Sequence, residues 1–387
     1  MVTRRLVKIA VQCLLAGLAI ACFVMALPRA ARIGAPEDVQ PPPAAKNAPP
    51  LPPASGRVVH VSTEAMLQAA VREIASNTTI VLAAGTYRLT STLWINGAMT
   101  DVAIRGATGS RDEVVLDGSS GLNAVPHGIW TGGGVRDITI ANLTIREVRQ
   151  HALIFNAGTQ RPHVYNVRLV DAGQQFIKAN PDGIGGGVND GTIEYSLIEY
   201  TTTAKDSYTN GVDVHGGVNW IIRNNEFRNI VSPPGAPLAG PAVLMWNGSK
   251  GTLTEDNTFL NCARGIAYGL EPRPGVDGFD AFDHWGGIIR GNVFIRTRAQ
   301  PGDAAIVVAD SPGTQVLDNT VVVSGTYASP IEYRFPGAHG VVVAGNCVDG
   351  AIRARDGATG IERDNRYGQH GRHGVCSTSA AAAAGTR

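Results

Sequence analysis

The sequence predicts an all-β fold: a single-stranded, right-handed parallel β-helix, which is a solenoid, with a short capping α-helix near its N-terminus. Three observations lead to this fold: the composition, a bend that recurs along the chain, and the short apolar strands between the bends. Glycine accounts for 47 of the 387 residues and charged residues for only 17%, which suits many short strands joined by tight turns. The formal net charge of +1 gives no basic excess, so we expect neither nucleic acid nor an acidic membrane surface as a partner.

The recurring bend carries asparagine in most of its copies and is followed by an apolar residue. The interval between successive apolar residues runs from 19, between Val348 and Tyr367, to 35, between Phe259 and Phe294. The nine copies are Asn142–Ile145, Asn166–Leu169, Tyr195–Ile198, Asn224–Phe227, Asp256–Phe259, Gly291–Phe294, Asp318–Val321, Gly345–Val348 and Asp364–Tyr367. Such periods are typical of stacked solenoid units rather than of separate domains.

Asparagine suits these bends for two reasons. It tolerates the left-handed backbone that a sharp turn requires, and amides stacked at the strand spacing of about 4.8 Å can bond to one another in a ladder. The apolar residue after each bend then fills the same interior layer in every coil. Leucine does not dominate the sequence and the helical segment of a leucine-rich repeat is missing, which favours the β-helix over that other solenoid.

Residues 1–27 have the layout of an export signal, because basic residues precede an apolar run from Ile9 to Leu27. Small residues permit cleavage after Ala26, but the run is also near the roughly 20 residues that span a bilayer, so a retained anchor in the inner membrane stays open. Either way we expect an exported chain in the periplasm, the cell envelope or outside the cell. The Pro/Ala-rich residues 28–56 are expected to form an extended linker that acts as a spacer.

The β-helix domain is expected over residues 57–376, beginning with the capping helix. Thr63 or the serine before it can cap this helix. Apolar residues then recur at helical spacing: Met66, Leu67, Ala70, Val71 and Ile74. A short helix that leads directly into strands would cover the open end of the solenoid.

Cysteine usage suggests a link at the C-terminal end of the domain. Cys347 and Cys376 can form a disulfide that ties the tail to the last repeat, and the alternative is that these and Cys262 are unpaired thiols. Residues 377–387 are expected to be a disordered tail.

Taken together, these residues resemble the pectin-lyase-like superfamily, in particular its right-handed β-helix repeat members. The resemblance covers residues 57–375 and is carried by Thr63 with Leu67–Val71, by Gly85–Tyr87, and by coils such as Trp220–Ile230 and Asn257–Ile266. It implies that a polysaccharide lies along one sheet. Polysaccharide lyases of the chondroitinase B and alginate lyase type are broadly similar and use Lys and Arg with a Ca²⁺ held by acidic residues, so Ca²⁺ is a candidate cofactor.

The strand that follows each bend points its second and fourth residues outward. On three adjacent coils these outward residues are Lys178, Asn180, Asp213, His215 and Trp246, and the last coils carry Glu332, Arg334, Arg353 and Arg355. Three long insertions are expected to stand beside this face as the walls of a binding groove. They are residues 201–209, 232–240 and 271–284.

The outward residues suit β-elimination from a glycan that contains uronic acid. That reaction needs a base to remove the proton next to the carboxylate and a cation to hold the developing negative charge. The predicted catalytic residues are His215, Lys178, Asp213 and Arg264. The predicted substrate-binding residues are Asn180, Trp246, Lys205, Tyr208, Glu271, Arg273 and His284, and the predicted Ca²⁺ ligands are Asp277, Asp280 and Asp283.

Other functions remain open at this point. A glycoside hydrolase is less favoured, because it needs paired carboxylates and the sequence contains no Asp-Asp dipeptide. The competing class is a non-catalytic surface protein that binds a glycan or a partner along the same groove, as a monomer. Each predicted site residue also has a structural alternative: Asp213 and His215 as solvated strand residues, and the three aspartates as a solvated loop.

Overall fold

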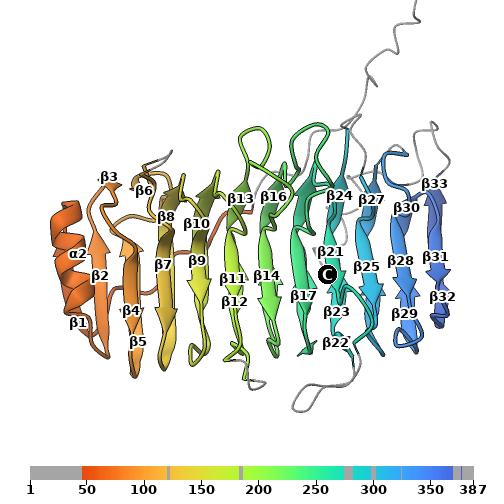
Figure 1. The fold of residues 1–387 in the computed structure, drawn as a ribbon, viewed down its shortest axis with the longest axis horizontal. Coiled ribbons are helices and arrows are strands. Elements are labelled where there is room, and N and C mark those ends of the chain that lie inside the picture. Colours follow the sequence, from red (N-terminus) through yellow and green to blue (C-terminus); the bar gives the residue numbers. More distant parts are fainter. Residues whose placement is uncertain are drawn as a thin grey trace, which may run out of the picture. The chain divides into compact units, whose positions relative to one another are not determined.

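The computed structural model describes residues 46–119, 123–182, 186–273, 282–297, 302–323 and 325–368, and Cys376. Strands of successive coils stack in parallel into a β-helix, and α2 (Glu64–Arg72) covers its first coil (Figure 1). The predicted parallel solenoid with a capping helix is confirmed. Among the described residues, no helix has the length and apolar character needed to cross a membrane, and the run from Ile9 to Leu27 lies outside them.

One wall of the solenoid is a ten-stranded parallel sheet in which each coil contributes one strand. Its strands are β4 (Leu93–Asn96), β7 (His127–Gly132), β9 (His151–Phe155), β11 (Ile177–Ala179), β14 (Val212–His215), β17 (Val243–Trp246), β21 (Ile266–Tyr268), β25 (Ile306–Ala309), β28 (Ile331–Arg334) and β31 (Ile352–Arg355). The register pairs Ile177 with Val212 and Val212 with Val243. The alignment of strands predicted from the sequence is therefore correct.

The other two walls form a 21-stranded sheet, because β8 (Val135–Arg146) and β10 (His163–Val170) run around the corner between them. One series is β1 (Arg57–Val61), β2 (Thr78–Leu82), β5 (Met99–Gly106), β12 (Thr192–Glu194), β15 (Ile221–Arg223), β19 (Leu253–Glu255), β23 (Ile288–Arg290), β26 (Gln315–Leu317), β29 (Val341–Ala344) and β32 (Gly360–Arg363). The other is β3 (Gly85–Arg88), β6 (Val114–Asp117), β13 (Leu197–Glu199), β16 (Glu226–Arg228), β20 (Thr258–Leu260), β24 (Val293–Ile295), β27 (Thr320–Val322), β30 (Cys347–Asp349) and β33 (Arg366–Gly368). A separate pair, β18 (Ser249–Lys250) and β22 (His284–Trp285), lies outside these walls.

The bends between these two walls have the backbone that the sequence predicted. The first residue of each of the nine bends has a positive φ, from 48° at Asn166 to 69° at Gly345. Only glycine adopts this region without strain, and asparagine and aspartate tolerate it better than other residues. Tyr195, with φ of 55°, is the one bend residue of the nine that belongs to neither group.

A ladder of buried asparagines runs along the second position of these bends. Asn257 donates to Oδ1 of Asn292 through both its backbone N–H and its side-chain amide, each at 3.0 Å. Asn292 bonds Asn319 in the same way, again at 3.0 Å. The ladder runs through Asn225, Asn257, Asn292, Asn319, Asn346 and Asn365. It satisfies backbone groups that the bend would otherwise bury without partners.

The apolar residue after each bend fills a continuous interior layer, as expected. Phe227, Phe259 and Phe294 are fully buried, and their rings stack with centroids 4.9 and 4.6 Å apart and nearly parallel planes. In the last coil Tyr367 is 47% exposed, because no described coil follows to cover it.

The cap of α2 forms as predicted. Thr63 Oγ1 accepts a hydrogen bond from the backbone N–H of Met66 at 3.2 Å, and Leu67 and Val71 are buried against the first coil. Met66, which the helical pattern placed on the apolar face, is 44% exposed. Only one side of this nine-residue helix is buried, with Leu67, Gln68 and Val71 on it.

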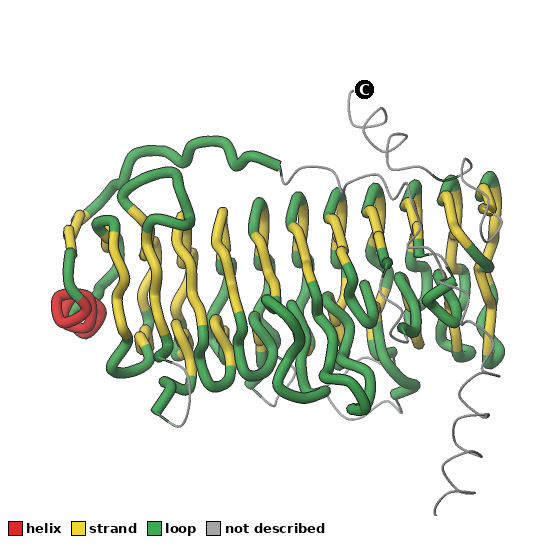
Figure 2. The backbone as a smooth tube through the Cα atoms, turned by 90° about the horizontal axis from the view of Figure 1, so that it is seen from above, coloured by secondary structure: helices red, strands yellow, loops and turns green. Residues whose placement is uncertain are grey.

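Residues 46–56, the described part of the predicted linker, pack against the solenoid. They run back along the outside of the solenoid toward α2, on a path that Figure 2 shows from above. Lys46 Nζ donates to Asn224 Oδ1 at 2.7 Å, Tyr165 donates to the carbonyl of Pro49, and Arg105 donates to that of Pro52 at 2.7 Å. Thr79 also donates to the carbonyl of Ser55 at 2.9 Å, and Lys46 lies 3.8 Å from Asp256. Contacts with five coils therefore hold this segment.

The predicted disulfide between Cys347 and Cys376 is present. It ties a residue 29 positions downstream to β30 in the last coils. Cys262 is buried in the interior.

The asparagine ladder generates a stability prediction for Asn292→Ala. The change leaves the backbone N–H of Asn257 and the carbonyl of Thr254 without their partner, so unfolding free energy should fall by roughly 2 to 6 kcal/mol, at about 1–3 per orphaned group. Chemical denaturation followed by circular dichroism measures the loss. Asn365→Ala is the matched control, because Asn365 accepts the same bonds from Asn346 in a half-exposed coil where water can replace it. An equal loss in both variants would contradict the ladder's role.

Candidate functional site

The candidate site lies on the outer side of the ten-stranded sheet, across β11, β14 and β17. The register places Lys178 beside Asp213, and His215 beside Trp246. Period-two alternation turns these residues outward, while Ile177, Val212 and Val214 on the same strands enter the core. The structure thus brings together four residues that the sequence predicted to share one face. We call Lys178, Asp213, His215 and Trp246 the charged cluster.

Short polar contacts join the charged cluster. Lys178 Nζ donates to Asp213 Oδ2 and lies 2.7 Å from His215 Nε2. Asp213 Oδ1 accepts from the indole N–H of Trp246 at 2.8 Å. The imidazole of His215 packs on the indole of Trp246 with ring centroids 4.7 Å apart. Next to them, Asn180 donates to Asn156 Oδ1 at 2.9 Å.

Lys178 and Asp213 are outward-facing and still nearly buried. Their exposed fractions are 8% and 2%, because neighbouring outward side chains cover them, whereas His215 and Trp246 remain partly exposed. Burial alone raises the pKa of Asp213, but the hydrogen bond with His215 and the Lys178 ammonium lower it by more, and the pKa stays below its ordinary value. Asp213 is therefore ionised at neutral pH and pairs with the lysine cation, which a buried charge requires.

Both ring nitrogens of His215 have polar neighbours. Nε2 lies 2.7 Å from the Lys178 ammonium and 3.4 Å from Asp213 Oδ1, and Nδ1 lies 2.6 Å from the side-chain amide nitrogen of Asn247. Asn247 therefore holds the imidazole on the side opposite Lys178. Sequence reasoning missed Asn247, which immediately follows the predicted Trp246.

The remaining predicted residues do not join the charged cluster. Lys205 and Tyr208 are exposed on the loop that leads into β14, at the opposite end of that strand from His215. Arg264 pairs with Asp303 at 2.8 Å and donates to the carbonyl of Ala239 at 3.4 Å, so its guanidinium is engaged by loop residues outside the charged cluster. Glu271, the first residue of the predicted insertion at 271–284, is exposed.

The predicted Ca²⁺ ligands are not assembled in the described part of the chain. Asp277 and Asp280 lie outside the described residues. Asp283 is buried and accepts backbone N–H bonds from Asn247 at 2.8 Å and Leu270 at 2.7 Å, and burial raises the pKa of this carboxyl. Within the described residues no group of three or more His, Cys, Asp or Glu side chains could hold a metal ion. The backbone of Arg273 donates to a neighbouring aspartate, Asp310, at 3.1 Å.

The prediction that His284 binds substrate is wrong, because this residue is in the interior. It has no exposed surface, its ring stacks on Tyr268 with centroids 4.3 Å apart, and its nitrogens contact the hydroxyls of Thr252 and Ser311. Burial lowers the pKa of His284 to about 3. Around His284 the chain changes between loop and strand within a few residues. The sequence pattern there does not indicate that this side chain is buried.

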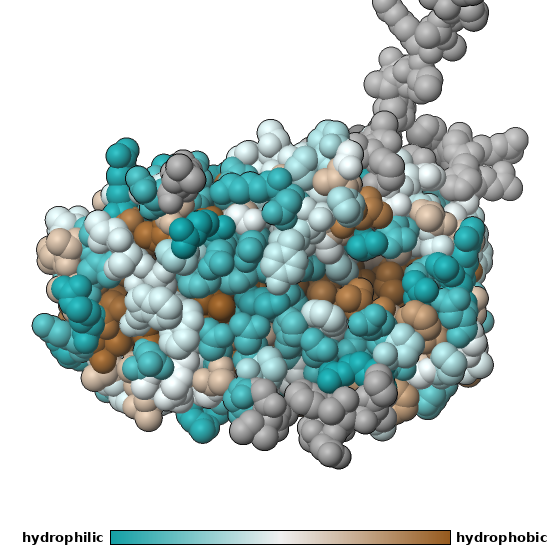
Figure 3. Space-filling view, viewed as in Figure 1, coloured by the Kyte–Doolittle hydropathy of each residue, from teal (hydrophilic) through white to brown (hydrophobic). Residues whose placement is uncertain are grey.

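Two tryptophans on the first strands of the same face were not predicted from the sequence. Trp94 pairs in register with Trp130, and Trp130 with Ile154, which in turn pairs with Lys178. The signal was present, since Leu93–Asn96 and Ile129–Gly132 have the same four-residue pattern as the later strands. Figure 3 shows this face, with hydrophilic residues over its middle and hydrophobic residues gathered over β21 and β25.

The geometry of stacked parallel coils agrees with a comparison of the sequence with known families. The family described as right-handed β-helix region matches residues 127–348. The chain belongs to the right-handed β-helix family. No curated protein sequence matches it.

Several solved structures of right-handed β-helix proteins are similar to this one in fold. An alginate lyase from Paenibacillus sp. str. FPU-7 is 14% identical, with a TM-score of 0.52 over 79% of this chain and 99% of the other. PfbA, a surface adhesin of Streptococcus pneumoniae, is 15% identical, with 0.51 over 79% and 85%. A tailspike protein of E. coli bacteriophage HK620, in complex with a pentasaccharide, is 13% identical, with 0.53 over 81% and 59%. At these identities the similarity shows the fold alone.

The burial of His284 generates a prediction for pH-dependent stability. The unfolded chain binds this proton below about pH 6.5, while the folded protein does so only near pH 3. The contribution of buried, neutral His284 to the unfolding free energy is therefore fully present above pH 6.5 and is lost as the pH falls toward 3. Between pH 6 and 4, His284→Gln should reduce the slope of unfolding free energy against pH by about 1.4 kcal/mol per unit. Chemical denaturation at a series of pH values measures the slope, and His60→Gln, at an exposed position on β1, should leave it unchanged. A wild-type slope in the His284 variant would rule the prediction out.

Proposed function

We propose that this protein is an exported polysaccharide lyase that cleaves a glycan containing uronic acid by β-elimination. One observation carries the proposal: Lys178, Asp213 and His215 form a hydrogen-bonded charged cluster on an outward sheet face, beside the partly exposed ring of Trp246. A solenoid does not need buried charges on its outer face in order to fold. Such a cluster costs desolvation energy, which a function would explain.

The cluster offers the two groups that the reaction needs. His215, partly exposed, is the base that removes the proton next to the carboxylate of the sugar: this carboxylate draws the Lys178 ammonium away from His215 Nε2 and so frees the lone pair of that nitrogen. The electron pair forms the C4–C5 double bond, the C4–O4 bond breaks, and the protonated imidazole returns the proton to the departing oxygen. The Lys178 ammonium, beside His215 Nε2, neutralises the charge that develops on the sugar carboxylate.

The other members of the site act by positioning. Asp213 holds Lys178 in place through its carboxylate, and Trp246 fixes the second oxygen of this carboxylate through its indole N–H. Asn247 orients the imidazole through Nδ1. Asn180 lies next to the cluster with its amide bonded to Asn156, where it can contact a sugar hydroxyl. Lys205 and Tyr208 extend the glycan contact at the other end of β14.

The similar structures are compatible with this proposal without deciding it. One is an alginate lyase, and another, the tailspike, is in complex with a pentasaccharide. Ca²⁺ remains part of the proposal only for the segment that contains Asp277 and Asp280. No step above depends on it.

A non-catalytic glycan-binding surface protein is the second candidate. The observation that favours it is that the polar groups of Lys178 and Asp213 already have partners and are nearly buried. In that case the cluster would be a rigid support under a binding surface. Both candidates share a chain that is exported through residues 1–27 and is either released or held in the inner membrane by residues 9–27.

The two candidates differ in whether an unsaturated product forms. Alginate, pectate and glycosaminoglycans are mixed with the wild type, with and without a chelator, and ultraviolet absorbance of the new double bond is followed. We expect product from one glycan class and a turnover lower by about 10²-fold or more in His215→Ala, the usual contribution of a general base.

The controls separate a lost base from lost structure. His339→Ala removes an exposed histidine on another turn and should leave turnover unchanged, while Lys178→Arg keeps the cation but shifts it and should lower turnover. Circular dichroism verifies folding of each variant. Glycan binding without an unsaturated product, or full turnover in His215→Ala, would contradict the lyase proposal and favour the glycan-binding protein.

A further inference from the structure

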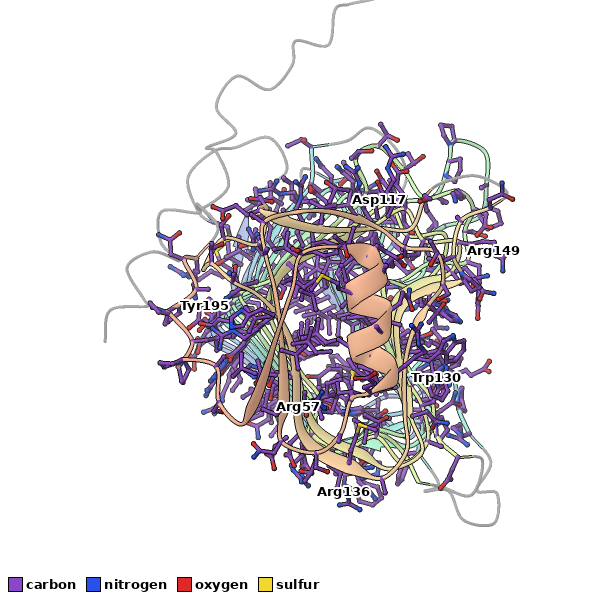
Figure 4. All side chains as sticks on the ribbon, turned by 90° about the vertical axis from the view of Figure 1, so that its left-hand side faces the viewer. Arg57, Asp117, Trp130, Arg136, Arg149 and Tyr195 are labelled. Atoms are coloured by element: carbon purple, nitrogen blue, oxygen red, sulfur yellow. A yellow bond between two sulfur atoms is a disulfide. The ribbon has the colours of Figure 1, made fainter. Side chains whose placement is uncertain are left out.

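Two tryptophans stand on the same outward row of the sheet as the charged cluster. Trp94 on β4 pairs with Trp130 on β7, and the register continues through Ile154 to Lys178. Viewed along the solenoid from the α2 end, Trp130 lies on the outside of the wall opposite Tyr195 (Figure 4). Trp94 is 52% exposed. Solvent therefore reaches an aromatic pair on the first strands of this face.

The two rings form a continuous aromatic surface. Their centroids are 4.8 Å apart and their planes are tilted by 49°. Gly132 makes room for this arrangement, because a Cβ added there would lie 2.5 Å from the six-membered ring of Trp130. The indole of Trp130 thus lies along its own strand instead of standing upright. A strand glycine often marks such a close approach.

The position of the pair fits a polymer that also reaches the charged cluster. With strands about 4.8 Å apart, Trp130 is roughly 10 Å and Trp94 roughly 14 Å from the Lys178 strand, measured along the solenoid. The amide contact between Asn180 and Asn156 spans part of this interval. On the other side of the cluster the same row continues with Leu244 and Ala267, so the aromatic surface lies on one flank only.

We propose that Trp94 and Trp130 form a second glycan subsite, which stacks on the sugar rings of the same chain that is held at the charged cluster. The inference rests on the proposed function for its choice of ligand. Aromatic rings present an apolar face with a low entropy cost of binding, and the CH-bearing face of a pyranose is its apolar counterpart. The subsite makes the protein select long chains and act within them, because only a polymer reaches both places.

The size of the aromatic surface favours a glycan over a protein partner or a second copy of this chain. Two indoles bury at most about 500 Å² between them. A specific protein interface needs roughly 800 Å² per partner. The surface is also continuous with the charged cluster, so one extended ligand explains both.

The test measures binding as a function of chain length in the His215→Ala background, which prevents turnover. Isothermal titration compares short and long chains of alginate, pectate and glycosaminoglycans. Trp94→Ala combined with Trp130→Ala should weaken binding of long chains by about tenfold or more and leave the shortest bound oligosaccharide unchanged. Gly132→Ala should reproduce part of this loss with both indoles still present, since it displaces the ring of Trp130.

Trp285→Ala is the matched control, because Trp285 is 49% exposed but lies on β22 outside the ten-stranded sheet. It should bind long chains like its parent. Undiminished binding in the double variant, an equal loss in the control, no binding of any glycan in the panel, or an oligomer that dissociates when both tryptophans are removed would each overturn the subsite. Binding through the two tryptophans with no unsaturated product from the wild type would refute only the lyase. Product formation with undiminished binding in the double variant would refute only the subsite.

Discussion

Hydrogen bonds between the backbones of successive coils dictate where every side chain of this solenoid lies. Each strand must sit about 4.8 Å from the next, in parallel and without slipping, so each position in a coil becomes a column that runs along the solenoid. The columns explain the buried asparagine ladder and the stack of Phe227, Phe259 and Phe294. They also explain the positive φ at every bend, because each coil must turn at the same place.

The same constraint builds the candidate site. Lys178 and Asp213 are 35 residues apart in the chain, yet the register places them side by side on neighbouring strands. Such a column can therefore place charged side chains within hydrogen-bond distance of one another while side chains of neighbouring coils cover them from solvent. This arrangement gives Asp213 a lowered pKa in spite of burial, and it leaves the imidazole of His215 partly exposed beside Trp246.

Sequence reasoning reached this far because strand alternation has a period of two. Once the bends were aligned, the outward places of Lys178, Asp213, His215 and Trp246 followed. It failed where local pattern carries no information. His284 follows an insertion whose length says nothing of its path, and Arg264 is engaged by Asp303 from a different loop. Trp94 and Trp130 were not predicted because both of their strands precede Asn142, the first of the nine bends, although these strands have the same pattern.

The parallel β-helix, the capping helix, the bend geometry and the outward columns of side chains could all be predicted, because they follow from local periodicity and backbone preference. The contacts that those side chains make emerge only when the coils are stacked. The hydrogen bonds among Lys178, Asp213 and His215 depend on register to within one residue, and the docking of residues 46–56 depends on contacts with five separate coils. Such contacts join segments far apart in the chain, so no local pattern encodes them.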